Sequence, residues 1–297
     1  MCSSDEGAAA ITVRGLHKHY GPLHAVDGVD LDVHRGEIFA LLGPNGAGKT
    51  TTVEILEGYR DRTSGEVSVL GHDPGKAGAW WRSRIGIVLQ STSDLADLTV
   101  EEVIGHFRTF YPAPRDVDEV IVAVGLEEKR TTTSRDLSGG QRRRLDVALG
   151  ILGDPELLFL DEPTTGFDPE ARRAFWDLIA QLRAAGTTIL LTTHYLDEAE
   201  RLADRVGVIL DGRILEVSAP ATLGGRATAS TVVSWSEGGG RRSLATDEPT
   251  RTVVELATRF PGGEVPELTV ERPSLEDIYL RMIGKAEATS TRVGVGA

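Results

Sequence analysis

One short segment limits the possible folds of this chain more than any other feature. Residues 43–50 read Gly-Pro-Asn-Gly-Ala-Gly-Lys-Thr, which matches the pattern G-x-x-x-x-G-K-[ST]. An apolar run, residues 38–42, precedes the segment, and residues 49–57 have a helical composition. Backbone N–H groups in such a loop curl around a phosphate chain, and the N-terminus of the following helix adds partial positive charge. The sequence therefore predicts a strand, a phosphate-binding loop and a helix, in that order.

The side chains of this loop suit a nucleoside triphosphate. Lys49 can reach the terminal phosphates as a point charge, and the hydroxyl of Thr50 can bind Mg²⁺. The residues predicted to bind nucleotide here are Gly43, Pro44, Asn45, Gly46, Ala47, Gly48, Lys49, Thr50 and Thr51.

A second apolar run ends in two acidic residues. Residues 157–160 predict a buried strand, and Asp161 and Glu162 follow it directly. Because a parallel sheet exposes its chemistry at the carboxyl ends of its strands, these acids are expected beside the phosphate loop. Asp161 can then hold Mg²⁺, and Glu162 can orient or deprotonate an attacking water. An acidic turn is common by itself, and its pairing with Lys49 and Thr50 favours the catalytic interpretation.

A third segment places small residues at the start of a helix predicted over residues 139–152. A serine and two glycines there offer a second backbone anion site, although a plain N-cap followed by a turn has the same composition. The candidates for nucleotide binding in this segment are Ser138, Gly139, Gly140 and Gln141.

Together these segments resemble the ATP-binding subunits of ABC transporters, over about residues 11–220. Thr165 and Phe167 depart from the residues that are frequent in the family's D-loop. The family's marks occur in order: Tyr20 at the aromatic loop, residues 43–50 at Walker A, Gln90 at the Q-loop, residues 137–141 at the signature, residues 157–162 at Walker B, residues 166–168 at the D-loop and His194 at the switch histidine.

The resemblance implies roles for three residues that would mean little alone. Tyr20 would stack on adenine, Gln90 would touch Mg²⁺ and the attacking water, and His194 would bond the γ-phosphate. Alone, each of these side chains could instead be structural. The implied catalytic residues are Lys49, Gln90, Glu162 and His194, and the implied metal ligands are Thr50, Gln90 and Asp161.

Strands that alternate with helices predict an α/β fold. The resemblance makes it a P-loop NTPase (ABC ATPase) core with an inserted helical subdomain, and composition after Pro220 adds a small C-terminal α+β domain. The predicted parts are a disordered N-terminus over residues 1–10, an ATP-binding domain over 11–222 with its helical subdomain over about 91–153, the C-terminal domain over 223–285 and a flexible tail over 286–297.

Composition narrows the choice of partners. The net charge of -13 argues against a broad basic face for nucleic acid. No stretch approaches the roughly 18 apolar residues of a membrane span. The resemblance implies ATP and Mg²⁺ as ligands, a head-to-tail homodimer with ATP at its interface, and a separate membrane permease. Such a subunit would lie on the cytoplasmic face of the cell membrane.

A segment near the C-terminus indicates which class of compound is transported. Residues 272–280 read Arg-Pro-Ser-Leu-Glu-Asp-Ile-Tyr-Leu, which resembles the ending of ATPases from drug-export systems of the daunorubicin/doxorubicin type. A capped amphipathic helix that simply packs on the domain would look alike. Export of a drug, antibiotic or other hydrophobic compound is thus expected. The alternative is an ABC-type ATPase that acts on a non-transport partner such as the ribosome.

Overall fold

A computed structural model of the chain describes residues 9–88 and 97–293. The chain divides into two compact units, Met1–Val217 and Ser218–Ala297, whereas the sequence placed the boundary between residues 222 and 223. Residues 9 and 10, assigned to the N-terminal disorder by sequence, begin the first strand, and Ala10 is buried.

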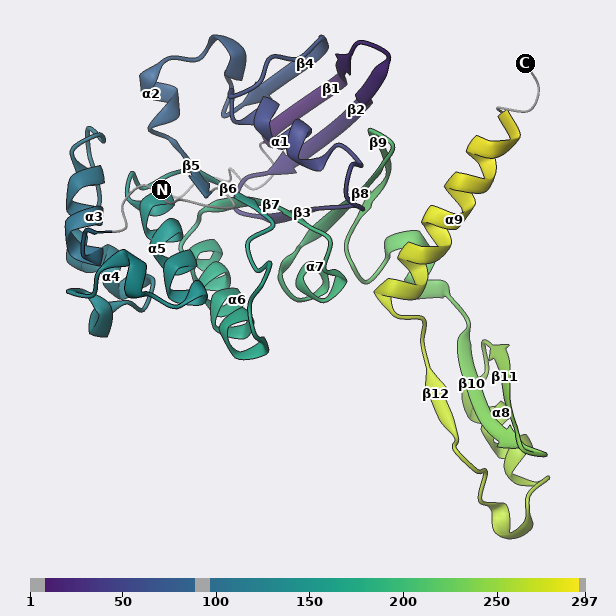
Figure 1. The fold of residues 1–297 in the computed structure, drawn as a ribbon. Helices are drawn as coiled ribbons and strands as arrows, with labels where there is room; N and C mark the ends of the chain where they lie inside the picture. Colours follow the sequence, from purple (N-terminus) through teal and green to yellow (C-terminus); the bar gives the residue numbers. More distant parts are fainter. Residues whose placement is uncertain (1–8, 89–96, 294–297) are drawn as a thin grey trace, which may run out of the picture. The chain divides into compact units, whose positions relative to one another are not determined.

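Within the described part of the first unit, six strands form a sheet of order β5-β6-β7-β3-β8-β9 (Figure 1). Strands β5, β6, β7, β3 and β8 run parallel to one another. The side chains of β3 and β7 are buried throughout, as expected of strands covered on both faces. The strands are β3 (Ile38–Leu42), β5 (Ile85–Val88), β6 (Leu157–Asp161), β7 (Thr188–Thr193), β8 (Arg205–Leu210) and β9 (Arg213–Ser218).

A second, antiparallel sheet of order β2-β1-β4 packs against this one through the main hydrophobic core. That core joins Val13 and Val33 of the antiparallel sheet to Phe39 and Phe159 of the parallel sheet. Val53 belongs to the same core. The strands of the second sheet are β1 (Ala9–Tyr20), β2 (Leu23–His34) and β4 (Ser64–Val69).

Helices α3, α4 and α5 are inserted between β5 and β6 and gather at one side of the parallel sheet (Figure 1). Two of them start with a capping box, Thr99 with Glu102 and Ser138 with Gln141. The helical elements of the described residues in this unit are α1 (Lys49–Leu56), η1 (Pro74–Lys76), α2 (Ala79–Arg82), α3 (Val100–Arg108), α4 (Val117–Ala123), η2 (Glu127–Lys129), η3 (Ser134–Asp136), α5 (Gly139–Ile151), α6 (Pro169–Ala184) and α7 (Leu196–Leu202).

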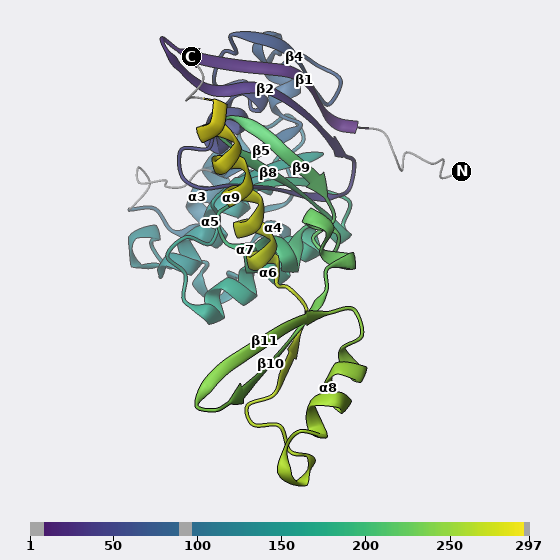
Figure 2. The ribbon, with the colours of Figure 1, turned by 90° about the vertical axis from the view of Figure 1, so that its right-hand side faces the viewer.

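The second unit is an antiparallel sheet of order β11-β10-β12 with α8 packed beside it (Figure 2). Its core contains Val233 and Trp235 of β10 and Leu256 of α8. The parallel core, the inserted helices and this small α+β unit confirm the predicted fold class. The elements are η4 (Leu223–Thr228), β10 (Thr231–Glu237), β11 (Gly240–Thr246), α8 (Pro249–Ala257), η5 (Pro261–Gly263), β12 (Thr269–Glu271) and α9 (Leu275–Val293).

The final helix is longer than its pattern predicted. The sequence predicted a flexible tail from residue 286, but α9 continues to Val293. Ser274 and Asp277 cap its start reciprocally. Residues 285–288 are Lys-Ala-Glu-Ala, all good helix formers, so Gly284 does not stop the helix. Among the described residues, no helix combines the length and apolar character needed to cross a membrane.

Candidate active site

The carboxyl ends of β6, β7 and β3 lie side by side because these strands are neighbours in one parallel sheet. The phosphate loop follows β3, Asp161 ends β6 with Glu162 directly after it, and His194 follows β7. The strand order therefore brings three segments that are far apart in sequence to one edge of the sheet.

The phosphate loop needs glycine at both of its ends. A Cβ on Gly43 would lie 2.4 Å from the carbonyl oxygen of Ile209, and a Cβ on Gly48 would lie 2.4 Å from that of Ala25. Gly48 also has φ of +101°, in the left-handed region that other residues avoid. The loop is fixed from outside, since the N–H of Gly212 donates to the carbonyl of Ala47 at 3.0 Å.

Lys49 is buried inside this loop, with 4% of its surface exposed. Its Nζ donates to the carbonyl oxygens of Gly43 at 2.8 Å and Pro44 at 3.2 Å. The same atom lies 3.4 Å from Oε1 of Glu162. The ammonium group is thus held by two carbonyl groups of the loop and paired with Glu162, the acid that follows β6. The remaining predicted loop residues surround it: Asn45, Gly46 and Thr50 are exposed, Ala47 is buried, and Thr51 is half-buried.

Glu162 adopts a backbone conformation that is unusual for a side chain of its kind. Its φ is +43°. Its N–H donates to the hydroxyl of Thr192 at 3.0 Å, which together with the carbonyl of the same residue at 3.2 Å holds this strained geometry. Its carboxylate then lies between Lys49 and His194, whose Nδ1 is 3.3 Å away. The site thus holds a carboxylate between two groups that can carry positive charge.

Asp161 and Thr50 also meet. Thr50 Oγ1 lies at hydrogen-bond distance, 3.5 Å, from Asp161 Oδ2, and Thr192 Oγ1 donates to Asp161 Oδ1. The hydroxyl and the carboxylate are both hard oxygen donors, the type that Mg²⁺ prefers. The donor set therefore fits the metal that the sequence predicted. Gln90, the third predicted ligand, lies outside the described residues.

Two further residues shape this site, and the sequence did not single them out. Thr192 holds both acids from the neighbouring strand, and Arg143 of α5 is buried with Nε donating to the carbonyl of Pro163 at 3.1 Å and Nη2 to that of Asp161 at 3.0 Å. Burial lowers the pKa of Arg143. The sequence signal that could have identified Arg143 is its spacing, because Arg143 shares a helix face with the buried Val147 and Gly150.

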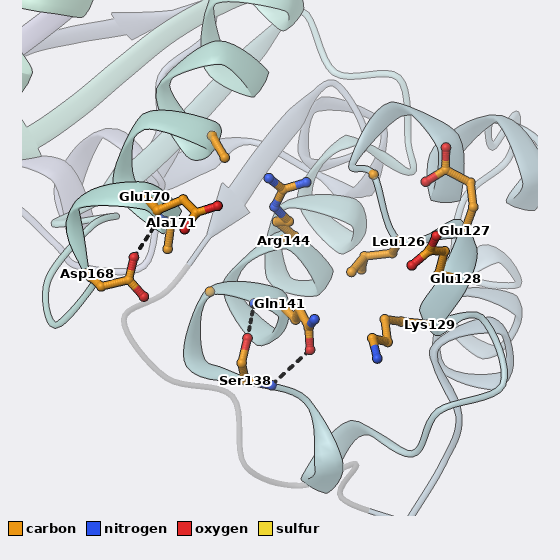
Figure 3. A pocket seen from close by; sticks show the side chains of 13 residues that line it. Leu126, Glu127, Glu128, Lys129, Ser138, Gln141, Arg144, Asp168, Glu170 and Ala171 are labelled. Carbon is orange, nitrogen blue, oxygen red and sulfur yellow. Dashed lines mark hydrogen bonds between the residues drawn. The ribbon is translucent and has the colours of Figure 1, made fainter.

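The signature residues line a different pocket, of ≈ 610 Å³, together with η2 and the start of α6 (Figure 3). Ser138 Oγ accepts from the N–H of Gln141, and Gln141 Oε1 accepts from the N–H of Ser138. Across this pocket, Asp168 caps α6 by accepting from the N–H of Ala171 at 2.8 Å. Ser138 and Gly140 thus lie on this pocket wall rather than beside Lys49 of the same chain.

Tyr20 ends β1 and is 40% exposed. Its hydroxyl accepts a hydrogen bond from Arg60, and Lys18 Nζ lies 5.0 Å from the ring centroid. A half-exposed ring of this kind is available for stacking, which is compatible with the role that the resemblance implies.

Glu57, at the end of α1, is buried close to the site. Burial, with the negative charges of Asp161 and Glu54 adding to it, raises the pKa of Glu57 from 4.5 to about 8. Between these values the folded chain keeps a proton that the unfolded chain loses. The free energy of unfolding therefore falls as pH rises through this range, by up to about 1.4 kcal/mol per pH unit.

We expect Glu57→Gln to remove this loss, because glutamine is neutral at every pH. Urea unfolding of the chain, free of nucleotide and Mg²⁺, at several pH values from about 5 to about 8 measures the effect. The wild-type chain should lose stability relative to Glu57→Gln as the pH rises. The control is Glu66→Gln, which replaces an exposed glutamate. Parallel pH profiles for the wild-type chain and Glu57→Gln would contradict the assignment.

The fold and this site define a P-loop nucleoside triphosphatase. Residues 26–165 match the family model described as ABC transporter. The daunorubicin resistance ATP-binding protein DrrA3 of Streptomyces coeruleorubidus is 36% identical over 93% of this chain and 96% of its own. A Nod factor export ATP-binding protein I of Ralstonia nicotianae is 36% identical over 93% of this chain and 94% of its own.

Solved structures agree with the sequence relatives. CbiO1 of Clostridium perfringens, part of an ABC transporter complex, has a TM-score of 0.65 at 27% identity and covers 72% of this chain and 89% of its own. MJ1267 in its ADP conformation, an ATP-binding cassette of an ABC transporter, has a TM-score of 0.64 at 24% identity over 71% of this chain and 91% of its own. The chain belongs to the ATP-binding subunits of ABC transporters, and it is an ATPase that energises transport. The predicted family and activity are confirmed.

Proposed function

We propose that this chain energises export of a drug, antibiotic or other hydrophobic compound through a separate membrane permease, from the cytoplasmic face of the membrane. The relatives named for daunorubicin resistance and Nod factor export match 93% of the chain, so their similarity extends past Val217 into the second unit. The likeness is therefore to whole export ATPases and not to the cassette alone. The drug-type ending over residues 272–280 supports the same cargo class.

In the proposed reaction, water attacks the γ-phosphorus of ATP, the bond from that phosphorus to the β–γ bridging oxygen breaks, and ADP and phosphate are released. The observation that carries it is the placement of Glu162 between Lys49 and His194, at 3.4 and 3.3 Å. Glu162 accepts the proton of the attacking water, Lys49 binds the terminal phosphates, and His194 donates to the γ-phosphate. Thr50, Asp161 and Gln90 would hold Mg²⁺, which supplies positive charge against the phosphates when bound.

The same proposal includes a head-to-tail homodimer. Ser138, Gly140 and Gln141 line a pocket whose walls do not include Lys49, so the second anion site at one ATP would come from a partner. Ser138, Gly139, Gly140 and Gln141 of one copy would close over ATP held by residues 43–51 of the other, with Tyr20 stacked on adenine. ATP binding would then favour the closed dimer, and hydrolysis would release it.

The test co-expresses the chain with a candidate membrane permease from the same genome and measures ATP-dependent accumulation of daunorubicin in inverted membrane vesicles. Accumulation that is lost in the Glu162→Gln variant supports the proposal. A chain that instead stays with ribosomes at high salt, and drives no accumulation, would overturn it in favour of the ribosomal alternative. The net charge of -13 favours the transport role over a nucleic-acid partner.

A further inference from the structure

The end of the β1–β2 hairpin gathers histidines on one face. His17 and His19 are two residues apart on β1, so both side chains project to the same side. In the antiparallel register, His17 pairs with Asp27 and His19 pairs with His24. Their rings are in contact: the His17 and His19 centroids are 5.6 Å apart, and His19 stacks on His24 at 3.9 Å.

The ligand atoms of this cluster are close enough to share one ion. One side-chain atom each from His17, His19 and Asp27 lies within 4.8 Å of the other two. The shortest of the acid contacts, from His17 Nδ1 to Asp27 Oδ1, is 3.2 Å, and His24 Nδ1 lies 3.8 Å from the same oxygen. A tetrahedral zinc site with bonds of about 2.0–2.1 Å requires ligand atoms about 3.3 Å apart.

Within the described part of the chain, two of these nitrogens are buried without a hydrogen-bond partner, His17 Nδ1 and His19 Nε2. Asp27 is oriented from the opposite side, because Arg213 donates from Nε at 2.9 Å and Nη2 at 2.6 Å to Oδ2. These two hydrogen bonds leave Oδ1 of Asp27 facing the imidazoles. Carboxylate ligands of metal ions are often oriented in this way by a hydrogen-bond donor that does not itself touch the metal. Asp27 is only one-fifth exposed and His17 one-third, so an ion could enter and still be largely enclosed.

We propose that His17, His19 and Asp27 form a binding site for a first-row transition metal ion of the Zn²⁺ class, with His24 beside it. Imidazole nitrogens and a carboxylate oxygen are the donors that Zn²⁺ takes, whereas a site for Mg²⁺ or Ca²⁺ would be built from oxygens. The site lies on β1 and β2, and a bound ion would join the two strands. Its ligands are not residues assigned to ATP chemistry, although the cluster borders the phosphate loop, because the N–H of Asp27 donates to the carbonyl of Gly212 at 2.8 Å and the N–H of Gly212 donates to that of Ala47.

The first test titrates the full, nucleotide-free chain with Zn²⁺ by calorimetry. We expect one ion per chain at this site and a weakening of about a hundredfold or more in the His17→Gln/His19→Gln double variant. The control is His106→Gln, which removes an exposed histidine on α3 and should leave binding unchanged. Zn²⁺ should also raise the unfolding temperature of the wild-type chain and of the control but not of the double variant. Equal Zn²⁺ affinity in the double variant and the wild-type chain would overturn the site.

A second measurement needs no variant and so does not depend on how the variants fold. The wild-type chain is treated with a histidine-acylating reagent with and without Zn²⁺, and the modified peptides are quantified by mass spectrometry. Zn²⁺ should protect the peptide that carries His17 and His19 while His106 reacts equally in both samples. Equal reaction of the His17/His19 peptide with and without Zn²⁺ would mean that the cluster holds no ion, and the proposal would fail.

Discussion

Replacing Glu162 by glutamine will leave ATP bound and slow its hydrolysis by about 10²–10⁴-fold, the range that a general base contributes. Glutamine keeps the size of the side chain and can still accept a hydrogen bond from Lys49, but its amide cannot take a proton from water. Because the nucleotide persists, the ATP-bound dimer should accumulate. Phosphate release measures the rate, and size-exclusion chromatography with Mg²⁺ and ATP measures the dimer.

Two controls belong with this variant. Glu66→Gln removes an exposed glutamate of β4 and should hydrolyse ATP at the wild-type rate. Calorimetric ATP affinity of Glu162→Gln should stay within a few-fold of wild type, which separates a lost base from a lost binding site. Near-normal turnover in Glu162→Gln would remove Glu162 from the role of base.

The parts of the fold that the sequence predicted are those with an unambiguous pattern. Strands β3 and β6 form from the apolar runs at residues 38–42 and 157–160, and the loop at residues 43–50 marks the step from strand to helix. Strand β8 was missed because Gly207 interrupts its apolar run and reads as a turn signal. In the structure, a Cβ on Gly207 would lie 2.9 Å from the ring of Phe39, so the glycine makes room for that side chain.

Strands β4 and β11 were missed for a different reason. Their sequences, Ser-Gly-Glu-Val-Ser-Val and Gly-Arg-Arg-Ser-Leu-Ala-Thr, carry little apolar periodicity and are extended because they pair with β1 and β10. Such pairing is a tertiary property that overrides local preference.

The site likewise contains residues that the sequence could predict and residues that it could not. Lys49, Asp161 and Glu162 were predictable because their chemistry depends on residue type at a fixed spacing. Their meeting point depends on the strand order β6-β7-β3, which no local pattern records. Thr192 and Arg143 contact mainly backbone atoms at and beside the two acids, and Thr192 also donates to the carboxylate of Asp161. The type of these two residues therefore gave little sign of their roles.

Replacing Lys49 by methionine should lower ATP affinity by at least about a hundredfold. A hydrogen bond to a charged group contributes about 1.5–3 kcal/mol, and each 1.4 kcal/mol is tenfold in Kd, so losing contacts to the terminal phosphates gives this scale. Methionine fills nearly the same volume, but it removes the donor to the carbonyls of Gly43 and Pro44 and the ammonium group beside Glu162. Calorimetric titration with ATP measures the loss, and Lys76→Met, which alters an 84% exposed lysine, is the matched control.

A chain that carries both Lys49→Met and Glu162→Gln tests whether ATP binding must come before dimer closure. If ATP must bind at the phosphate loop before the dimer closes, the Lys49→Met/Glu162→Gln chain will stay monomeric under conditions where Glu162→Gln dimerises. Lys49→Met then masks Glu162→Gln, because a base has no function in a site that holds no nucleotide. A double variant that still dimerises with ATP would mean that closure does not require the ammonium group at Gly43, and the coupling of nucleotide binding to dimer formation would have to rest on other residues of the loop.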